Sequence, residues 1–568
     1  MRNIRKSTKF AGGLLGSVLL LAACGGGSDS ASDTTAAGGG SGSGESAMTI
    51  TYDIADEAQW EDATPITAAD FQCTFDAAMN TPGSISTSGY DKITSVEAGD
   101  SDKQVVVKFK ELYAPYKNLF SGLLKKAAVA DCKDISGDFG TTFNYSGAEW
   151  KMDSWSADQV VFLPNENYWG PRKVGEGVKK LVMVPRAETQ ITDLKAGSVD
   201  FIYPQFYAGI TDELADPNVK TVLNYGGDYE ALYMNLGVDG KNMTADGEKT
   251  RPFADKAFRE AFYKSIDLDA LFKQIYIPIA SDGTLLTCGP IIPGMYCPEG
   301  IFGNKYDQDA ADELMEDAGY EKNGEGLWAK DGVAPKIEWV INTGNIRRES
   351  TQAFLIPLLK KAGFNVVAYN CDADCYFQKR LPGMDYDLAM YISTAPPDPA
   401  YLVGGFSSDQ VPTPENDNKG GNFQGWMNET ATEALKNSDR EIDEAKRAEL
   451  IKSAIVEMDK DYILIPLFQF PKSGAYRTDR VDNVEGELNN NAAFNDTYQW
   501  KDLDGDGQIV IGAEQWPGCL NPVTECASSS WYLWTVAQQL MPGAFRTTND
   551  GKYVVTELLK SDPKVETD

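Results

Sequence analysis

Short apolar segments of strand character alternate with helical segments through most of this chain, and the alternation limits the fold more than any other feature. Residues 337–341 have the pattern of an apolar strand, 351–362 that of a helix, and 365–369 that of the next strand. A strand, a helix and a strand in this order favour an α/β fold over an all-β sandwich or a helical bundle. A chain of 568 residues is also too long for one simple core, so we expect two or three lobes.

The first 23 residues have the pattern of an export signal. Four basic residues precede an apolar run, Ala11 to Ala23, which is too short to span a bilayer. The run ends in Leu-Ala-Ala-Cys, which resembles a bacterial lipobox, and the resemblance implies that Cys24 becomes the lipidated first residue of the mature chain. The alternative is an ordinary secretion signal. We expect a protein anchored by lipid to the extracytoplasmic side of the membrane, with residues 24–46 as a flexible Gly/Ser-rich tether.

The charge balance excludes several classes of function. The chain has 84 acidic and 52 basic residues, a net charge of −32, and no histidine. Nucleic-acid binding is disfavoured, because phosphates would be repelled. Ser-His-Asp and Cys-His catalysis, histidine metal sites and histidine pH switches are excluded outright.

The remaining eight cysteines suit an oxidising compartment. Their even number and mostly local spacing predict four disulfides rather than a metal site, since no Cys-x-x-Cys pair occurs. The expected pairs are Cys73–Cys132, Cys288–Cys297, Cys371–Cys375 and Cys519–Cys526.

Several segments resemble family 5 of the extracellular solute-binding proteins of ABC importers, the oligopeptide- and dipeptide-binding proteins. The matching stretches, in the family's order, are WEDATPITAAD at 60–70, NENYWG at 165–170, LKAGSVD at 194–200 and RPFADKAFREA at 251–261. The resemblance implies a two-lobed, periplasmic-binding-protein-like (type II) α/β clamp with an extra subdomain. It also implies a monomer without enzymatic activity or required cofactor, which encloses a peptide or other small solute and delivers it to an importer permease.

The two ends of the chain depart from the family pattern. The strand that normally opens the mature protein is missing after the tether, and Gly507 to Glu514 resembles it instead. We therefore expect a circular permutation, which is structurally mild because domain termini often lie close together. The alternative is an unrelated appendage on a truncated lobe. The expected divisions are 1–23 signal peptide, 24–46 tether, 47–235 lobe I with the extra subdomain, 236–465 lobe II, 466–500 return to lobe I and 501–568 the permuted piece.

The resemblance places the ligand between the lobes, with crossing segments near residues 229–235 and 462–470. Aromatic and amide side chains suit a cleft that surrounds a ligand with few fixed polar contacts. The candidate ligand-binding residues are Tyr203, Glu230, Tyr233, Asn235, Asn422, Trp426, Trp531 and Trp534. Each could equally be a packed core residue. On the ligand reading, Trp426→Ala weakens binding without much loss of melting temperature.

A peptide ligand is put in doubt by one position. In peptide binders of the family an aspartate shortly before an Asp-Pro pair holds the ligand amine, and here that position is Ala395, with Asp398-Pro399 following. A buried amine needs a paired charge. Sugars, modified peptides and other solutes therefore stay open.

A calcium ion is a further candidate. Asp502, Asp504 and Asp506, followed by Gly507, have the D-x-D-x-D-G spacing of a calcium loop. An EF-hand requires an acid at the twelfth position, which here is Ala513, with Glu514 one place late. The alternative is a polar loop.

Two other functions remain open from the sequence. One is a secreted glycosidase or other hydrolase that uses two of the many carboxylates, although no such pair is marked. The other is a calcium-stabilised surface sensor lipoprotein. The solute receptor is the leading prediction.

Overall fold

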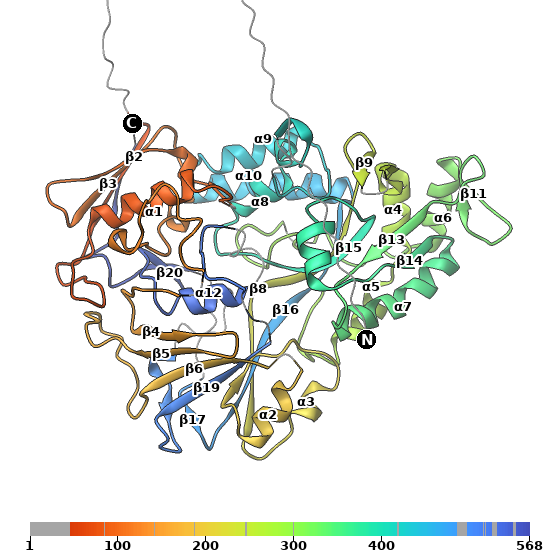
Figure 1. Ribbon diagram of the computed structural model, residues 1–568. Helices are drawn as coiled ribbons and strands as arrows, with labels where there is room; N and C mark the ends of the chain where they lie inside the picture. Colours follow the sequence, from red (N-terminus) through yellow and green to blue (C-terminus); the bar gives the residue numbers. More distant parts are fainter. Residues whose placement is uncertain are drawn as a thin grey trace, which may run out of the picture. The chain divides into compact units, whose positions relative to one another are not determined.

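The computed structural model describes residues 46–567 except 85, 141, 187, 245–246, 299, 417–419, 485–496, 515, 517, 525–530 and 549–551. Within these residues, ten strands form one mixed sheet (Figure 1). In spatial order they are β14 Asn365–Ala368, β13 Lys336–Val340, β15 Leu388–Thr394, β8 Val219–Met234, β16 Leu464–Arg477, β7 Phe201–Ile202, β19 Gln508–Ala513, β6 Lys180–Pro185, β5 Val160–Pro164 and β4 Trp150–Trp155.

Smaller sheets and the helices complete the described fold. A second sheet has the order β2 Ile93–Ala98, β3 Gln104–Phe109, β1 Met48–Asp53 and β22 Lys564–Thr567. Strand pairs are β9 Lys241–Thr244 with β10 Gly247–Thr250, β11 Glu321–Lys322 with β12 Trp328–Ala329, β17 Val481–Asp482 with β18 Lys501–Asp502, and β20 Phe545–Thr547 with β21 Tyr553–Val555. The α-helices are α1 Ala68–Asn80, α2 Gln190–Ala196, α3 Ile210–Glu213, α4 Lys256–Lys264, α5 Leu268–Leu271, α6 Gln308–Asp317, α7 Ile346–Ala362, α8 Tyr401–Phe406, α9 Glu429–Ser438, α10 Glu444–Lys460 and α12 Trp531–Ala537.

Local sequence explains where several helices begin and end. Helix α7 begins five residues before the predicted Thr351, because the Asn345 side chain caps it by accepting the Arg348 N–H. It ends at Gly363, whose φ of 106° only glycine adopts easily. Helix α10 begins at Glu444 because the Asp443 side chain caps it by accepting the Lys446 N–H, and the preceding helix, α9, ends at Ser438. The predicted βαβ unit is confirmed, since β13 and β14 pair in parallel around α7.

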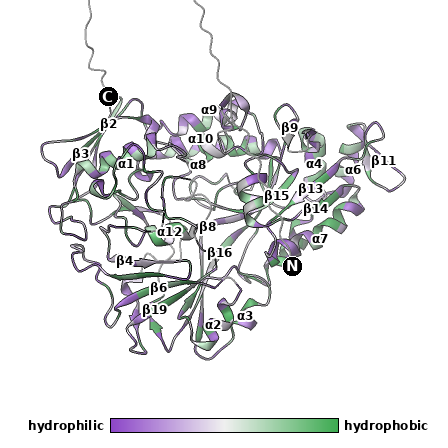
Figure 2. Cartoon of the chain, viewed as in Figure 1, coloured by the Kyte–Doolittle hydropathy of each residue, from purple (hydrophilic) through white to green (hydrophobic). Residues whose placement is uncertain are grey.

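Apolar side chains fill three main clusters. The first, which we assign to lobe I, packs β1–β6 and includes Ile50 and Phe162. The second extends from Val182 to the helices α4 and α7 of the other half, which we call lobe II. The third lies under α8, α9 and α10 and includes Ile451. In Figure 2 the strands β6 and β19 are mainly hydrophobic, whereas the helix α6 carries both colours, as amphipathic helices do.

The last part of the chain, residues 503–567, which we call the tail, completes both sheets of lobe I. Strand β19 pairs in parallel with β6 on one side and with β7 on the other, and Ile511 is fully buried between them. Strand β22 pairs antiparallel with β1, with Thr49 opposite Glu566. The tail thus adds a strand to each of the two larger sheets, and the circular permutation stays a prediction. The two ends of the described chain therefore lie side by side.

Three of the four predicted disulfides are confirmed: Cys73–Cys132, Cys288–Cys297 and Cys371–Cys375. Cys519 is also disulfide-bonded, but Cys526 lies outside the described residues. The signal sequence, Cys24 and the tether lie outside them as well. Among the described helices, none combines the length and apolar character that crossing a membrane requires.

The strand pairings predict that the tail can be moved without loss of the fold. We expect a rearranged chain that starts at Leu503, joins Thr567 to Met48 through a short turn and ends at Asp502 to fold with a melting temperature within about 5 °C of the original. A chain that simply stops at Asp502 should not give a cooperative thermal transition, because β6 and β7 would lose their shared partner. A truncated chain that melts as cooperatively as the full chain would show that the tail is an appendage.

Candidate functional site

A cavity of about 1430 Å³ lies where three parts of the chain meet. Lobe I contributes residues within 114–122 and 147–172, lobe II contributes residues within 291–296 and 394–401, and the tail contributes residues within 534–558. Wall residues therefore come from both lobes and from the far end of the sequence. A concave site with this construction can enclose a small molecule on several sides.

Two crossing strands form the floor of the cavity and join the lobes. Strands β8 and β16 pair antiparallel over most of their length, but the register shifts between Pro466 and Phe468 and again between Gln469 and Pro471. Gly226 and Gly227 lie opposite the second shift and line the cavity together with Gln469, whose Nε2 donates to the Gly226 carbonyl at 2.6 Å. Register shifts and adjacent glycines weaken the ladder locally. The sheet is therefore easiest to bend beneath the cavity, in agreement with the expected crossing segments.

The lobe II wall carries the position at which peptide binders of this type were expected to hold an amine. Ala395 lines the cavity, and its backbone N–H donates to the Gly227 carbonyl at 2.8 Å. Asp398 also lines the cavity, but its two oxygens accept from Nη1 and Nη2 of Arg447 at 2.6 and 2.7 Å. A bidentate pair occupies both carboxylate oxygens. Within residues 395–398 of this wall, the one carboxylate is therefore already paired and is not available to a ligand amine.

A second group of ion pairs centres on Arg172 in the lobe I wall. Its Nη2 contacts the tail residue Glu557 at 2.8 Å, and its Nε contacts Glu149. The Tyr168 hydroxyl donates to the same Glu557 oxygen. Burial raises the pKa of Glu149 to about 7, against the opposing effect of Arg172. Tyr168 and Gly170 belong to the NENYWG motif, which thus helps to hold the tail against lobe I.

Glu230 does not line the cavity, although the sequence suggested it as a ligand-binding residue. It is fully buried on β8, and its oxygens accept from Arg347 Nε and Arg348 Nε, both at 2.6 Å. Burial raises the pKa of Glu230, but the two guanidinium groups outweigh that effect and hold it below its ordinary value. The cluster fixes the start of α7 against β8.

Tyr233 and Asn235, at the end of β8, are also internal. The Tyr233 ring stacks on Tyr391 with centroids 4.1 Å apart, and its hydroxyl hydrogen-bonds Ser393. Asn235 Nδ2 donates to the carbonyl of Met384 at 2.7 Å and to that of Tyr386 at 2.8 Å. Tyr233 thus packs β8 against β15, and Asn235 binds the segment before β15; neither residue lines the cavity.

Asn422 and Trp426 hold a loop of lobe II. Asn422 is fully buried and donates to the Ser407 and Trp426 carbonyls. Trp426 is 2% exposed in the third apolar cluster, and its Nε1 donates to Asp461 at 3.0 Å. Tyr203 is buried in the lobe I core. Of the eight suggested residues, Trp534 on α12 lines the cavity, while the side chain of Trp531 lies outside the described residues.

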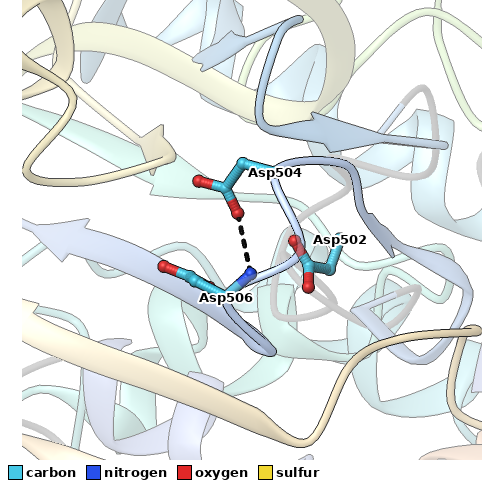
Figure 3. A group of neighbouring side chains, drawn as sticks. All are labelled: Asp502, Asp504 and Asp506. Atoms are coloured by element: carbon cyan, nitrogen blue, oxygen red, sulfur yellow. Dashed lines mark hydrogen bonds between the residues drawn. The ribbon is translucent and has the colours of Figure 1, made fainter.

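The acidic loop has the compact form that the sequence predicted, but it already has a cationic partner. One carboxylate oxygen from each of Asp502, Asp504 and Asp506 lies within 4.8 Å of the other two. Figure 3 shows the three side chains on one loop. Arg480 contacts Asp504 at 2.8 Å and Asp506 at 3.5 Å. Glu514 hydrogen-bonds Gln205 and does not join the loop. The loop is therefore held by a guanidinium group, and calcium binding stays a prediction.

A polar contact joins the lobes beside the cavity. The Ala114 N–H of lobe I donates to the Asp439 carbonyl of lobe II at 2.7 Å, and Arg440 contacts Glu111 at 2.7 Å. Glu111 also contacts Lys92 at 3.0 Å. The Asp439 carboxylate lies behind this contact, where its Oδ1 is buried with no hydrogen-bond partner among the described residues.

Sequence reasoning missed other residues of the cavity wall. Trp169 Nε1 and Gln538 Oε1 are buried polar atoms without a hydrogen-bond partner among the described residues. Lys117, Arg546 and Lys552 line the cavity as well. Trp169 lies in the NENYWG motif, which the sequence analysis used only to identify the family. No local signal marks the others, because their place in the wall depends on how the tail folds back on lobe I.

Comparison with known proteins identifies relatives that are named as binding proteins. The model of the bacterial extracellular solute-binding proteins, family 5 (middle region) matches residues 43–412. A probable monoacyl phosphatidylinositol tetramannoside-binding protein of Mycobacterium tuberculosis is 31% identical over 169 residues, which is 27% of this chain and only 26% of that protein's length. A putative ABC transporter peptide-binding protein of Brucella ovis is 23% identical over 415 residues, 70% of this chain and 72% of its own.

Solved structures show the same fold. The crystal structure of NikZ from Campylobacter jejuni in complex with Ni(L-His) matches with a TM-score of 0.69 and 20% identity, covering 80% of this chain and 88% of NikZ. The two-lobed architecture predicted from the sequence is therefore confirmed.

The buried carboxylates predict that the protein becomes less stable as pH rises towards neutrality. Burial raises the pKa of Asp439 to about 7 from 3.8, with Arg447, Lys92 and Arg440 opposing the shift and Asp398 adding to it. The folded protein therefore keeps a proton that the unfolded chain has released, and this stabilising contribution is lost as pH rises through about 7. We expect urea unfolding at pH 5 and pH 8 to show a loss on the order of 1–3 kcal/mol that Asp439→Asn reduces. Equal pH slopes in both proteins would contradict this assignment.

Proposed function

The chain belongs to family 5 of the bacterial extracellular solute-binding proteins, and from this premise we propose that it captures a small solute between its lobes and delivers it to the permease of an ABC importer. The cavity carries the proposal, because its walls come from lobe I, lobe II and the tail, and its floor is the weakest part of the β8–β16 ladder. A solute that contacts both walls stabilises the closed arrangement over an open one. The permease then recognises the closed protein, and the solute is not altered chemically.

The solute class is open within this proposal. Named relatives bind different things: a mannosylated phospholipid in one case, peptides in others and a nickel–histidine complex in NikZ. Ala395 has no charge that could pair with a peptide amine, and Asp398 is already paired with Arg447, so both argue against a site built around such an amine. Several tryptophan and tyrosine side chains in the walls suit stacking against sugar, aromatic or lipid-derived groups.

We also propose that the protein is a monomer anchored by a lipid at Cys24, with residues 24–46 as the tether. The Leu-Ala-Ala-Cys sequence after a short apolar run supports this proposal. Residues 501–568 would be a circularly permuted form of the family's opening segment, which the pairing of β19 with β6 and β7 supports. Mass spectrometry of the intact mature protein tests the anchor directly, because acylation of Cys24 adds a defined mass.

The hydrolase alternative has less support. Among the described cavity residues, the carboxylates of Asp398 and Glu557 are both paired with arginines, and Glu444 stands apart from them on α10. A glycosidase needs two carboxylates facing one bond. Incubation with oligosaccharides and analysis for products separates the two functions.

A pair of tryptophan variants tests the site. Native mass spectrometry of protein purified without refolding should detect a co-purified solute, and Trp534→Ala should lower its occupancy or affinity at least tenfold with little change in melting temperature, because Trp534 lines the cavity. Trp426→Ala is the matched control: it removes a core side chain and should cost about 3–5 kcal/mol of unfolding free energy. If Trp534→Ala destabilises the fold as much as Trp426→Ala and keeps the solute, the cavity is not the site.

Calcium binding at Asp502, Asp504 and Asp506 is a separate proposal, supported by their spacing and convergence. Arg480 would have to move away from Asp504 to make room for the ion. On this proposal millimolar calcium raises the melting temperature by several degrees, EDTA reverses the rise, and Asp504→Asn abolishes it. An unchanged melting temperature would show that Arg480 alone holds the loop.

A further inference from the structure

The most buried charged side chains of the cavity lining are paired with one another. Asp398 is paired with Arg447, and their side chains are 12% and 6% exposed. Arg172 and Glu557, each 19% exposed, form a second pair. Because each of these cations has a carboxylate partner, this part of the lining presents little net charge to a solute.

The other charged side chains of the lining are in contact with water. Glu444, Arg546 and Lys552 are exposed, and Lys117 is partly exposed, so solvent screens their charges. A solute that carries a full charge into the cavity would lose hydration without meeting an unpaired buried charge of opposite sign among the described residues. The lining therefore favours a neutral solute.

Two polar atoms of the lining are buried without a hydrogen-bond partner among the described residues, and the two are complementary. Trp169 Nε1 is a donor in lobe I, and Gln538 Oε1 is an acceptor in the tail. A buried polar atom without a partner costs free energy, which a solute recovers when it binds that atom. Both residues are partly exposed, so a small rotation of either side chain brings its polar atom to the cavity surface.

Aromatic rings line the cavity on both of its sides. Trp169 and Trp534 belong to lobe I and the tail, whereas Tyr296 and Tyr401 belong to lobe II. The Gln538 N–H donates to the Trp534 carbonyl at 2.9 Å, so the two side chains follow each other by one helical turn and lie on the same face. A planar apolar surface therefore lies next to the acceptor that lacks a partner.

One class of neutral molecule matches all of these features. A sugar hydroxyl both donates and accepts, so neighbouring hydroxyls can accept from Trp169 Nε1 and donate to Gln538 Oε1. The C–H groups of a sugar ring carry a small positive charge and pack on the negative face of an aromatic ring. We propose, resting on the proposed function above, that the solute presents neutral sugar rings to the cavity, bound by Trp169 Nε1 and Gln538 Oε1 and stacked on the aromatic rings.

A panel of defined compounds tests the class of solute. Neutral trisaccharides of glucose, galactose and mannose, the zwitterion trialanine and the anion citrate are each added at the same millimolar concentration, and the melting temperature is measured. We expect at least one trisaccharide to raise it by at least about 2 °C, because a ligand that binds only the folded state stabilises it, and the two charged compounds to leave it unchanged. No shift with any trisaccharide, or a larger shift with trialanine or citrate, would overturn the proposal.

Two substitutions test the two atoms, and a third is the matched control. Trp169→Phe keeps an aromatic ring but removes the indole N–H, and Gln538→Met keeps the length of the side chain but removes the acceptor. We expect each to weaken binding of the trisaccharide that gives the largest shift by about fivefold or more, measured by calorimetry, with little change in the melting temperature of the free protein. Trp516 also has a buried Nε1 without a partner among the described residues, but it lies outside the cavity lining, so Trp516→Phe should leave the affinity within about twofold. Unchanged affinity in both cavity variants, or an equal loss in Trp516→Phe, would overturn the assignment.

The identity of a co-purified solute separates this inference from the proposed function. A solute with neutral sugar rings, detected by native mass spectrometry and confirmed by sugar analysis, supports both. A co-purified peptide, organic acid or metal complex would overturn the inference and leave the solute receptor intact. A protein that carries no solute and responds to no compound of the panel would contradict both.

Discussion

The pairing of β8 with β16 is the interaction on which the rest of the structure depends. Both strands run through the middle of the ten-stranded sheet, so that β15, β13 and β14 continue it on one side and β7, β19, β6, β5 and β4 on the other. Because the lobes share this pair, they are connected by hydrogen-bonded backbone and not by loose linkers. The register shifts at Pro466–Phe468 and Gln469–Pro471 then decide where the shared sheet can bend, and the cavity lies at that place.

Buried charged side chains in and around the cavity wall form ion pairs with one another. The cavity wall and its surroundings contain compact clusters, such as Arg447 with Asp398 and Arg172 with Glu149 and Glu557, in which each buried ion has a partner. Burial raises the pKa of Glu149, Asp439 and Glu514 to about 7. A chain without histidine thus still has groups that change protonation near neutral pH. The absence of histidine excluded one kind of pH response but not pH response as such.

Much of the fold could be predicted from the sequence, and little of the site. The hydrophobic pattern located the β13–α7–β14 unit, and the motifs at 60–70 and 165–170 identified the family. The prediction of the cavity-lining residues failed for a physical reason. Residues such as Tyr233, Asn235 and Trp426 have side chains that suit ligand contacts, but the same side chains can also pack in a core or hydrogen-bond buried polar groups. Which aromatic or amide faces a cavity depends on tertiary placement. Trp534 was predicted as a cavity residue because the tail was assigned to lobe I. Lys117 was not predicted, because the part of the wall that contains it forms only when the tail packs against lobe I.

Strand β19 has a consequence for the order in which the protein can be built. Its two neighbours, β6 and β7, lie about 300 residues earlier in the chain, so each has an unpaired edge until β19 has been synthesised. Lobe II, by contrast, has its strands β13, β14 and β15 complete long before that point. A chain that is synthesised only as far as β18 would therefore have one half with its strands paired and one half with exposed, aggregation-prone strand edges.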